Sequence, residues 1–312
     1  MSAPTIAPLR IATRKSQLAL WQAHHVAMLL RQAHPGLEVE LVPLLTQGDR
    51  IQDRSLAAIG GKGLFIRELE VALEETRADI AVHSMKDLPG DLPEGLIIAA
   101  VLDRADARDA LVTGKAAGLD DLPRGARVGT SSLRRQAQLL AARPDLKIQT
   151  LRGNVDTRLR RHDAGEMDAI VLACAGLTRL GLESRITARL DPKICLPAVA
   201  LGVIGIECRG ADQQTLDLVS ALDHPAVRIA MDAERAFAHR LGGSCQSPIA
   251  AHARLEGGRL MLEGLVAEPD GSRLLRDSAS GNREDPVALG ELLAERILAA
   301  GARSLLERLR TG

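Results

Sequence analysis

The segment from Arg240 to Ala250, RLGGSCQSPIA, places a cysteine in an unusual local sequence. Cys245 follows two glycines and a serine, in a stretch too irregular for a helix and too rich in glycine for a strand. A buried structural cysteine prefers a regular apolar segment, whereas a thiol on a turn is accessible to reagents. The segment therefore indicates a cysteine that reacts or carries a group.

The segment VHSMKDLP ends an expected buried strand and presents Ser84, Lys86 and Asp87 at the carboxyl edge of a sheet. An acid beside a base in a cleft is suited to proton transfer or to the stabilisation of a cation. The alternative is an aspartate that only forms a turn before Leu-Pro. Asp87 is therefore a candidate for acid–base chemistry.

The segment GTSSLRRQ predicts an anion site where a strand meets a helix. The hydroxyl groups of Thr130, Ser131 and Ser132, with the free backbone N–H groups of a helix N-terminus, are typical anion ligands. Arg134 and Arg135 lie in the first helical turn, where a cation interacts unfavourably with the helix dipole, so an anion is expected there. The alternative is a capped helix with a solvated charged face.

Further arginines occur at similar junctions, namely Arg152 and Arg158 in LRGNVDTRL and Arg179 in AGLTRLG. Arginine is suited to bidentate recognition of carboxylates and phosphates. The segment RLRRHD alone is more typical of a solvated helix face. The repeated placement of arginines between strand and helix nevertheless favours a binding function.

The glycine-rich segment AAIGGKGLF resembles a phosphate loop only superficially, because the spacing G-x-x-x-x-G-K-[ST] is absent. Its glycines suit a mobile lid that carries Lys62 and Phe65. A plain loop that enters a helix is the alternative.

The elements that must position these groups alternate between strand and helix through the first two thirds of the chain. This order predicts α/β lobes with parallel sheets, which bind ligands at the carboxyl ends of their strands. The predicted strands are 9–13, 37–45, 78–84, 126–130, 146–153 and 167–177, and the predicted helices are 16–32, 63–77, 131–144 and 154–165.

The sequence pattern changes after about residue 225. A predicted helix at 227–241, short strands at 249–255 and 259–267 and a final helix from about Pro286 to Arg310 indicate a small α+β domain. Charged or proline-containing segments near 103–110 and 191–202 mark the other boundaries. We therefore expect domain 1 at 1–102 with 203–224, domain 2 at 103–202 and domain 3 at 225–312.

The composition excludes several classes of function. The chain of 312 residues carries 40 basic and 40 acidic side chains, so it has no general basic field for nucleic acid or membrane binding. Aromatic residues make up only 1%, too few for stacking on single-stranded nucleic acid. The four cysteines form no C-x-x-C pair, and we see no signal peptide or membrane-spanning run, which predicts a cytoplasmic protein without a metal site.

Taken together, these segments resemble the porphobilinogen deaminase (hydroxymethylbilane synthase) family. The resemblance covers essentially the whole chain, from LRIATRKSQLALWQA through GGKGLF, ADIAVHSMKDLP, GTSSLRRQ, LRGNVDTRL, AGLTRLGLESRI and GIECR to GGSCQSPI. It implies two lobes similar to those of periplasmic binding proteins, followed by a small third domain. It also implies a transferase of porphyrin and haem biosynthesis, which condenses four porphobilinogen molecules head to tail into hydroxymethylbilane and releases ammonia.

The resemblance assigns roles to individual positions. It implies a dipyrromethane cofactor joined through a thioether to Cys245, and it matches Asp87 to the family's catalytic aspartate. The other matched positions are expected to bind the cofactor (Ser84, Lys86, Thr130, Ser132, Arg134 and Arg135) or the substrate (Arg14, Ser16, Lys62, Phe65, Arg152, Arg158 and Arg179).

The resemblance implies that the protein acts on porphobilinogen and linear oligopyrrole intermediates and passes its product to uroporphyrinogen-III synthase. It also implies a monomer that binds neither nucleic acid nor membranes.

The chain departs from the family pattern at one notable place, where Ala200, Leu201 and Gly202 replace the usual Gly-Gln-Gly. Ser244, which replaces a glycine, is a milder change. A non-catalytic two-lobed binding protein and a deaminase that has lost activity remain as alternatives.

Overall fold

The computed structural model describes residues 8–46, 66–243 and 247–311. The chain divides into two compact units, Met1–Asp103 with Val203–Val227 and Arg104–Gly202 with Arg228–Gly312. Among the described residues, none of the helices combines the length and apolar character that a bilayer span requires.

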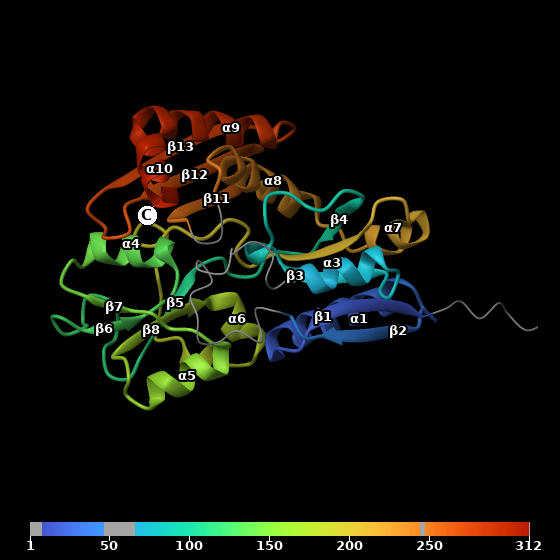
Figure 1. Cartoon of the computed structure of the whole chain (residues 1–312), viewed down its shortest axis with the longest axis horizontal. Coiled ribbons are helices and arrows are strands. Elements are labelled where there is room, and N and C mark those ends of the chain that lie inside the picture. Colours follow the sequence, from blue (N-terminus) through green and yellow to red (C-terminus); the bar gives the residue numbers. More distant parts are fainter. Residues whose placement is uncertain (1–7, 47–65, 244–246, 312) are drawn as a thin grey trace, which may run out of the picture. The chain divides into compact units, whose positions relative to one another are not determined.

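The first unit is built on a five-stranded sheet in the order β2-β1-β3-β10-β4 (Figure 1). Only β10 runs antiparallel to its neighbours. The strands are β1 (Leu9–Arg14), β2 (Val39–Leu44), β3 (Ile80–Ser84), β4 (Leu96–Val101) and β10 (Ile204–Arg209). The helices are α1 (Gln17–Ala33), α3 (Arg67–Glu74), the 3-10 helix Met85–Asp87 and α7 (Gln213–Ser220).

Helices cover both faces of this sheet, as the alternation of side chains along β3 shows. Val82 packs in one apolar cluster with Val26 of α1, whereas Ala81 packs in another with Leu69 and Leu73 of α3. Because successive side chains of a strand point to opposite faces, a strand buried on both sides is apolar throughout. This explains why the segment ADIAVHS was predicted correctly as a buried strand.

The second unit contains a five-stranded sheet of the same topology, in the order β7-β6-β8-β5-β9. Here β5 is the strand that runs antiparallel to its neighbours. The strands are β5 (Asp109–Thr113), β6 (Arg127–Gly129), β7 (Lys147–Gln149), β8 (Ala169–Ala173) and β9 (Ala188–Arg189). The helices are α4 (Leu133–Ala142), α5 (Val155–Asp163), α6 (Cys174–Arg179) and the 3-10 helix Glu183–Arg185.

The two antiparallel strands correct the prediction of purely parallel sheets. Strand β5 follows the irregular segment 104–108, and β10 follows the irregular segment 200–203. A parallel connection needs a crossover, usually a helix, to return the chain to the starting edge of the sheet. The strand that precedes each segment belongs to the other five-stranded sheet, so β5 and β10 join their sheets without a crossover from a neighbouring strand, and neither is constrained to run parallel.

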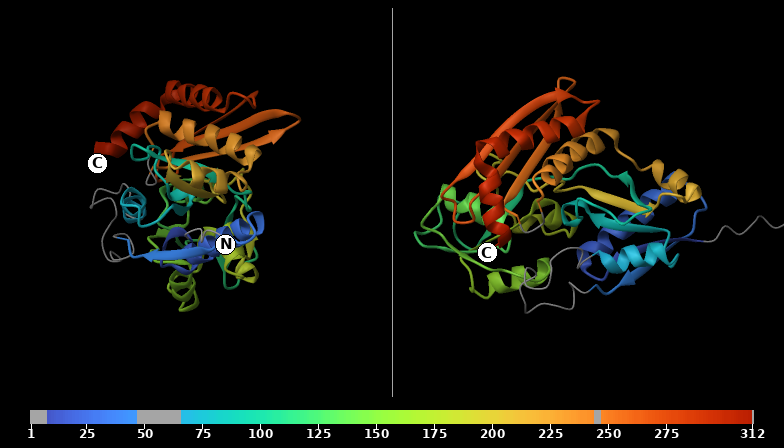
Figure 2. Two further views of the ribbon diagram at one scale, coloured as in Figure 1. Left: turned by 90° about the vertical axis from the view of Figure 1, so that its right-hand side faces the viewer. Right: turned by 45° about the horizontal axis from the view of Figure 1, so that its top comes forward.

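The same unit contains a three-stranded antiparallel sheet in the order β11-β12-β13. Figure 2 shows this sheet in orange, with α9 and α10 in red along one face. Phe237 is fully buried here, and a side chain at Gly264 would lie 2.5 Å from its ring. The elements are α8 (Pro225–Arg240), β11 (Ile249–Glu256), β12 (Arg259–Ala267), β13 (Leu274–Asn282), α9 (Pro286–Ile297) and α10 (Arg303–Thr311). The fold is therefore two α/β lobes with a small C-terminal α+β domain, as predicted.

Several element boundaries differ from prediction; the strand predicted at 146–153, for example, ends at Gln149. The expected helix from Pro286 to Arg310 is broken between α9 and α10, because Gly301 adopts a φ of 110°. A side chain at Gly301 would also lie 2.7 Å from the guanidinium of Arg273. Strand β8 ends at Ala173, and α6 begins at once with Cys174, although the apolar run continues to Leu177.

Candidate active site

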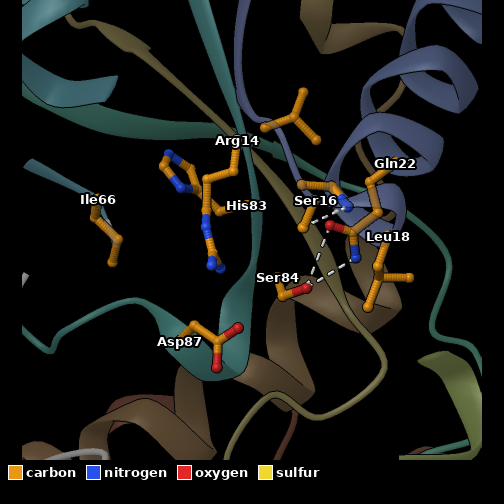
Figure 3. Close-up of a pocket in the computed structure, with 10 residues that line it drawn as sticks. Arg14, Ser16, Leu18, Gln22, Ile66, His83, Ser84 and Asp87 are labelled. Carbon is orange, nitrogen blue, oxygen red and sulfur yellow. Dashed lines mark hydrogen bonds between the residues drawn. The ribbon is translucent and has the colours of Figure 1, made fainter. Parts of the chain in front are cut away.

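A pocket in the first unit lies at the carboxyl ends of β1 and β3 (Figure 3). Such ends are where open α/β sheets bind ligands. Four of the predicted site residues line it, namely Arg14, Ser16, Ser84 and Asp87. The other lining residues are Leu18, Ala19, Gln22, Ile66, Val82 and His83.

Arg14 and Asp87 give the pocket one cation and one carboxylate. Arg14 is the last residue of β1, and Asp87 ends the 3-10 helix that directly follows β3. Figure 3 shows the side chain of Arg14 extending toward the carboxylate of Asp87. Asp87 is exposed and Lys86 is half-buried. The arrangement can bind a carboxylate through the guanidinium and hold a proton or a cation at the carboxylate.

Two polar side chains fix the floor of the pocket. Nε2 of the buried Gln22 donates to Oγ of Ser84 at 2.8 Å, which ties α1 to the end of β3. Ser16 is the N-cap of α1 and accepts the N–H of Ala19 at 3.4 Å. Both serines therefore hold local structure at the pocket, in addition to the ligand-binding roles predicted for them.

A group of buried ionisable side chains lies next to the pocket. Nε2 of His83 is 2.7 Å from Oε2 of Glu207 on β10, and both side chains are buried. Oε1 of Glu207 has no hydrogen-bond partner among the described residues. Burial raises the pKa of Glu70 on α3, and the charge of Glu207 raises it further. The surroundings of Glu70 therefore favour retention of its proton.

The hydroxyl groups of GTSSLRRQ stabilise the junction of β6 and α4. Oγ of Ser132 accepts the N–H of Arg135 at 3.4 Å and caps α4. Oγ1 of the buried Thr130 accepts the N–H of Ser132 at 3.2 Å, and Oγ of Ser131 donates to the carbonyl of Leu151 at 2.6 Å. The predicted strand-to-helix junction is confirmed, with a capped helix N-terminus.

The two arginines of this segment share one buried carboxylate. Arg134 and Arg135 are only 4% and 6% exposed, so the alternative of a solvated helix face is wrong. Oδ2 of Asp109 is 2.8 Å from Nη1 of Arg134, and Oδ1 is 2.7 Å from Nη2 of Arg135. Burial alone raises the pKa of Asp109, but the two guanidinium groups outweigh it and hold that pKa well below its ordinary value. Two cations facing one anion leave a positive charge at this helix N-terminus.

The remaining predicted arginines occupy separate places in the second unit. Arg158 lies in the first turn of α5, where its Nε donates to the carbonyl of Gly153 at 2.8 Å. Arg152 is half-buried between β7 and α5. Arg179 ends α6, and its Nη2 donates to the carbonyl of Gly202 at 2.7 Å. Burial lowers the pKa of Arg179 to about 10.

The segment that departs from the family pattern is a tight, buried turn. Ala200 has a φ of 55° and Gly202 a φ of 88°, both in the left-handed region. A Cβ at Gly202 would lie 2.5 Å from the carbonyl oxygen of Ala105, so glycine is required there. The side chain of Leu201 is buried, with 2% of its surface exposed.

Three predicted residues, Cys245, Lys62 and Phe65, lie outside the described residues. The structure also adds residues that the sequence interpretation missed. Gln22 and His83 line the pocket, and Asp109 binds the arginine pair. Gln22 is a polar residue on the buried face of a helix, which is a recognisable signal; Asp109 was treated only as part of a charged boundary segment.

Two family models match the chain. One, described as "Porphobilinogen deaminase, dipyromethane cofactor binding domain", matches residues 9–217. The other, described as "Porphobilinogen deaminase, C-terminal domain", matches residues 229–299.

The chain is also similar to named proteins and to solved structures. The porphobilinogen deaminases of Xanthomonas axonopodis pv. citri and Xanthomonas campestris pv. campestris are each 56% identical to it over 301 residues, covering 96% of this chain and 99% of each relative. A nutrient binding protein from Burkholderia cenocepacia bound to methionine is 15% identical, covering 70% of this chain and 93% of that one, with a TM-score of 0.44. A periplasmic substrate-binding protein of an ABC transporter from Coxiella burnetii is 17% identical, covering 70% and 94%, with a TM-score of 0.44.

The family models together span both units, and the relatives match over nearly their full length. The polar groups of the pocket and of the α4 N-terminus come from the segments that first indicated the resemblance. On these grounds, the chain belongs to the porphobilinogen deaminase family.

Proposed function

We propose that the chain is an active hydroxymethylbilane synthase, which condenses four porphobilinogen molecules head to tail into hydroxymethylbilane and releases ammonia at each step. The observation that carries the proposal is the pocket that Arg14 and Asp87 line at the carboxyl ends of β1 and β3. Membership of the porphobilinogen deaminase family supports this reaction for the chain.

Asp87 is the proposed catalytic residue. Departure of ammonia from porphobilinogen requires a proton at the amine and leaves an electrophilic azafulvene. Attack on the azafulvene by the terminal pyrrole of the growing chain then makes the attacking ring cationic. A carboxylate that faces the pocket stabilises that charge and accepts the proton that the attacking pyrrole carbon loses. The proton lost at the carbon balances the one that leaves with ammonia, so Asp87 returns to its starting state.

The basic residues are proposed to bind carboxylates. Each porphobilinogen unit carries an acetate and a propionate, and burial of an unpaired carboxylate costs several kcal/mol. Lys86, Arg14 and the arginines of the second unit supply the counter-charges. Ser16, Ser84, Thr130, Ser132, Lys62 and Phe65 complete the proposed set for cofactor and substrate.

Dipyrromethane is the proposed primer, attached through a thioether to Cys245. When bound, it supplies the pyrrole carbon to which the first substrate unit is joined. The other three cysteines support this assignment indirectly: burial raises the pKa of Cys174 and Cys195 to about 12 and that of Cys208 to about 11. Thiols with such values are poor nucleophiles. The cationic α4 N-terminus, with Arg134 and Arg135 against one carboxylate, fits a carboxylate-bearing group.

The further parts of the proposal concern organisation and cellular context. Residues 1–102 with 203–224, 103–202 and 225–312 act as three domains, with the cofactor cysteine on the third. The enzyme works as a cytoplasmic monomer on porphobilinogen and linear oligopyrrole intermediates. Its product passes to uroporphyrinogen-III synthase.

Intact mass and turnover of the purified protein test the proposal together. The mass is expected to exceed that of the chain by two pyrrole units, and Cys245→Ser is expected to remove the excess and the activity. Cys208→Ala serves as the control, because its thiol is buried and should leave the adduct in place. An active protein without the adduct would overturn the cofactor assignment. An adduct without turnover would mean a deaminase that has lost activity.

A further inference from the structure

The carboxylate of Asp109 lies at the centre of the contacts made by the two arginines of α4. It is completely buried at the start of β5, in a different part of the chain from the arginines it contacts. Nε and Nη2 of Arg135 both donate to Oδ1, at 3.0 and 2.7 Å. A carboxylate buried at this depth persists in its charged form only when cations and hydrogen bonds compensate it.

The two guanidinium groups are held to different extents. All three nitrogens of Arg135 are engaged, because Nη1 also donates to the carbonyl of Val171 at 2.9 Å. Within the part of the chain that the structure describes, the guanidinium of Arg134 makes its polar contacts through Nη1. This nitrogen lies 2.8 Å from Asp109, donates to the carbonyl of Leu196 at 2.7 Å and donates to Sγ of Cys195 at 3.5 Å. The Nε–Nη2 edge of Arg134 is therefore left for a further carboxylate.

Neighbouring groups leave the carboxylate little freedom to move. Sγ of Cys195 donates to Oδ2 of Asp109 at 3.3 Å. Gln138, one turn after Arg134, accepts the N–H of Leu196 at 2.7 Å and donates to its carbonyl at 3.2 Å. These contacts fix the segment 195–196 against α4, so the arginine side chains and their carboxylate form one rigid group.

We propose that Asp109 is a positioning residue for cofactor binding: it fixes both guanidinium groups and leaves the Nε–Nη2 edge of Arg134 available to a carboxylate of the dipyrromethane. The inference rests on the proposed function. The inference adds Asp109 to the proposed function as a residue that touches neither the substrate nor the thioether and acts only through the two arginines. Without the carboxylate of Asp109, no negative charge would offset the repulsion between the two guanidinium groups, and their orientation would no longer be fixed.

The test compares Asp109→Asn and Asp109→Glu with a variant that destabilises the same helix and keeps the ionic group. Leu139→Ala is suited to this purpose, because Leu139 is fully buried on α4 and belongs to the apolar core of the lobe. For each full-length protein, the fraction with the adduct is measured by intact mass, first as purified and then during incubation with porphobilinogen. The melting temperature is measured on the same samples.

Asp109→Asn is expected to acquire the adduct at least about 10-fold more slowly than wild type, because misplaced groups lose much of their effect. Leu139→Ala should acquire it at the wild-type rate despite a lower melting temperature. Asp109→Glu keeps the negative charge, so it provides a folded variant for the test if Asp109→Asn fails to fold. Asp109→Glu should also slow adduct formation, because its carboxylate lies one methylene further from the backbone.

Two results would overturn the inference. One is that Asp109→Glu and Asp109→Asn both fold and both form the adduct at the wild-type rate. The other is an equal loss in Asp109→Asn and in Leu139→Ala at matched melting temperatures, which would make the role of Asp109 structural. A wild-type protein without any adduct would instead contradict the proposed function itself, so the two failures are distinguishable.

Discussion

The carboxylate of Glu234, on α8, accepts the backbone N–H of Ala200 at a distance of 2.7 Å. The same side chain is fully buried, accepts the N–H of Ala253 at 2.7 Å and forms two hydrogen bonds with the guanidinium of Arg104, at 2.7 and 2.9 Å. A single glutamate therefore joins the segment that precedes β5, the segment that precedes β10 and the edge strand β11 of the C-terminal sheet.

Removal of this charge should destabilise the protein strongly. Glu234→Gln leaves Arg104 without its counter-ion in a largely buried place, and breaking such a pair costs about 3–5 kcal/mol. The free energy of unfolding from denaturant titration measures the loss. Glu256→Gln is the matched control, because Glu256 pairs with Arg254 on the surface and such pairs contribute about 0–1 kcal/mol. Equal effects of the two substitutions would contradict the assignment.

The same carboxylate predicts a pH dependence. Burial raises the pKa of Glu234, but Arg104 and the hydrogen bonds outweigh it and lower the pKa to about 2, from an ordinary 4.5. Because the folded pKa lies below the unfolded one, the stabilisation is complete above pH 4.5 and is lost as the pH falls toward 2. The loss amounts to roughly 3 kcal/mol. Unfolding measured from pH 6 to pH 3 should show the gap between wild type and Glu234→Gln narrowing; a constant gap would contradict the prediction.

Asp87→Asn should slow turnover by ~10²–10⁴-fold, the range typical of a lost general acid or base. The fold and the adduct should be retained, since an exposed carboxylate is replaced by an amide of the same shape. Single-turnover release of ammonia measures the effect. Asp103→Asn, at a side chain that is 84% exposed, is the control. A variant within a few-fold of wild type would exclude the proposed role of Asp87.

Ala200 and Gly202 should respond oppositely to exchange of glycine and alanine. Ala200→Gly removes left-handed strain that costs about 1–2 kcal/mol, against about 0.4–1 kcal/mol of added flexibility in the unfolded chain. It should leave stability unchanged or raise it slightly. Gly202→Ala should destabilise, because its Cβ would meet the carbonyl of Ala105 at 2.5 Å. Melting temperatures of the two variants measure the contrast, and an unaffected Gly202→Ala would argue against the turn.

Leu201→Gln restores the residue that the family usually carries, yet it should not improve the enzyme. The side chain is buried, and an amide without partners there would cost roughly 1–3 kcal/mol of stability. Turnover should stay at the wild-type level. A large gain in product formation would instead identify the chain as a weakened deaminase whose lost glutamine mattered.

Much of the local structure follows from the sequence because it depends on neighbours in the chain. Ser16 and Ser132 were expected at the starts of helices, and both cap one, since a serine hydroxyl reaches the N–H three residues on. The strand-to-helix order likewise placed Asp87 at the carboxyl end of a strand. Apolar periodicity alone, however, placed the end of β8 too late and missed the break at Gly301. The sequence of apolar residues continues without interruption across both boundaries, so it does not reveal them.

Long-range partners were decided only by the tertiary structure. Asp109 binds arginines 25 and 26 residues away, Glu207 meets His83 across 124 residues and Glu234 meets Arg104 across 130. Nothing in the local pattern distinguishes these carboxylates from those on the surface. They differ because packing removes water from them, and a carboxylate that has lost its water is stable only beside the cation or donor that the fold brings to it.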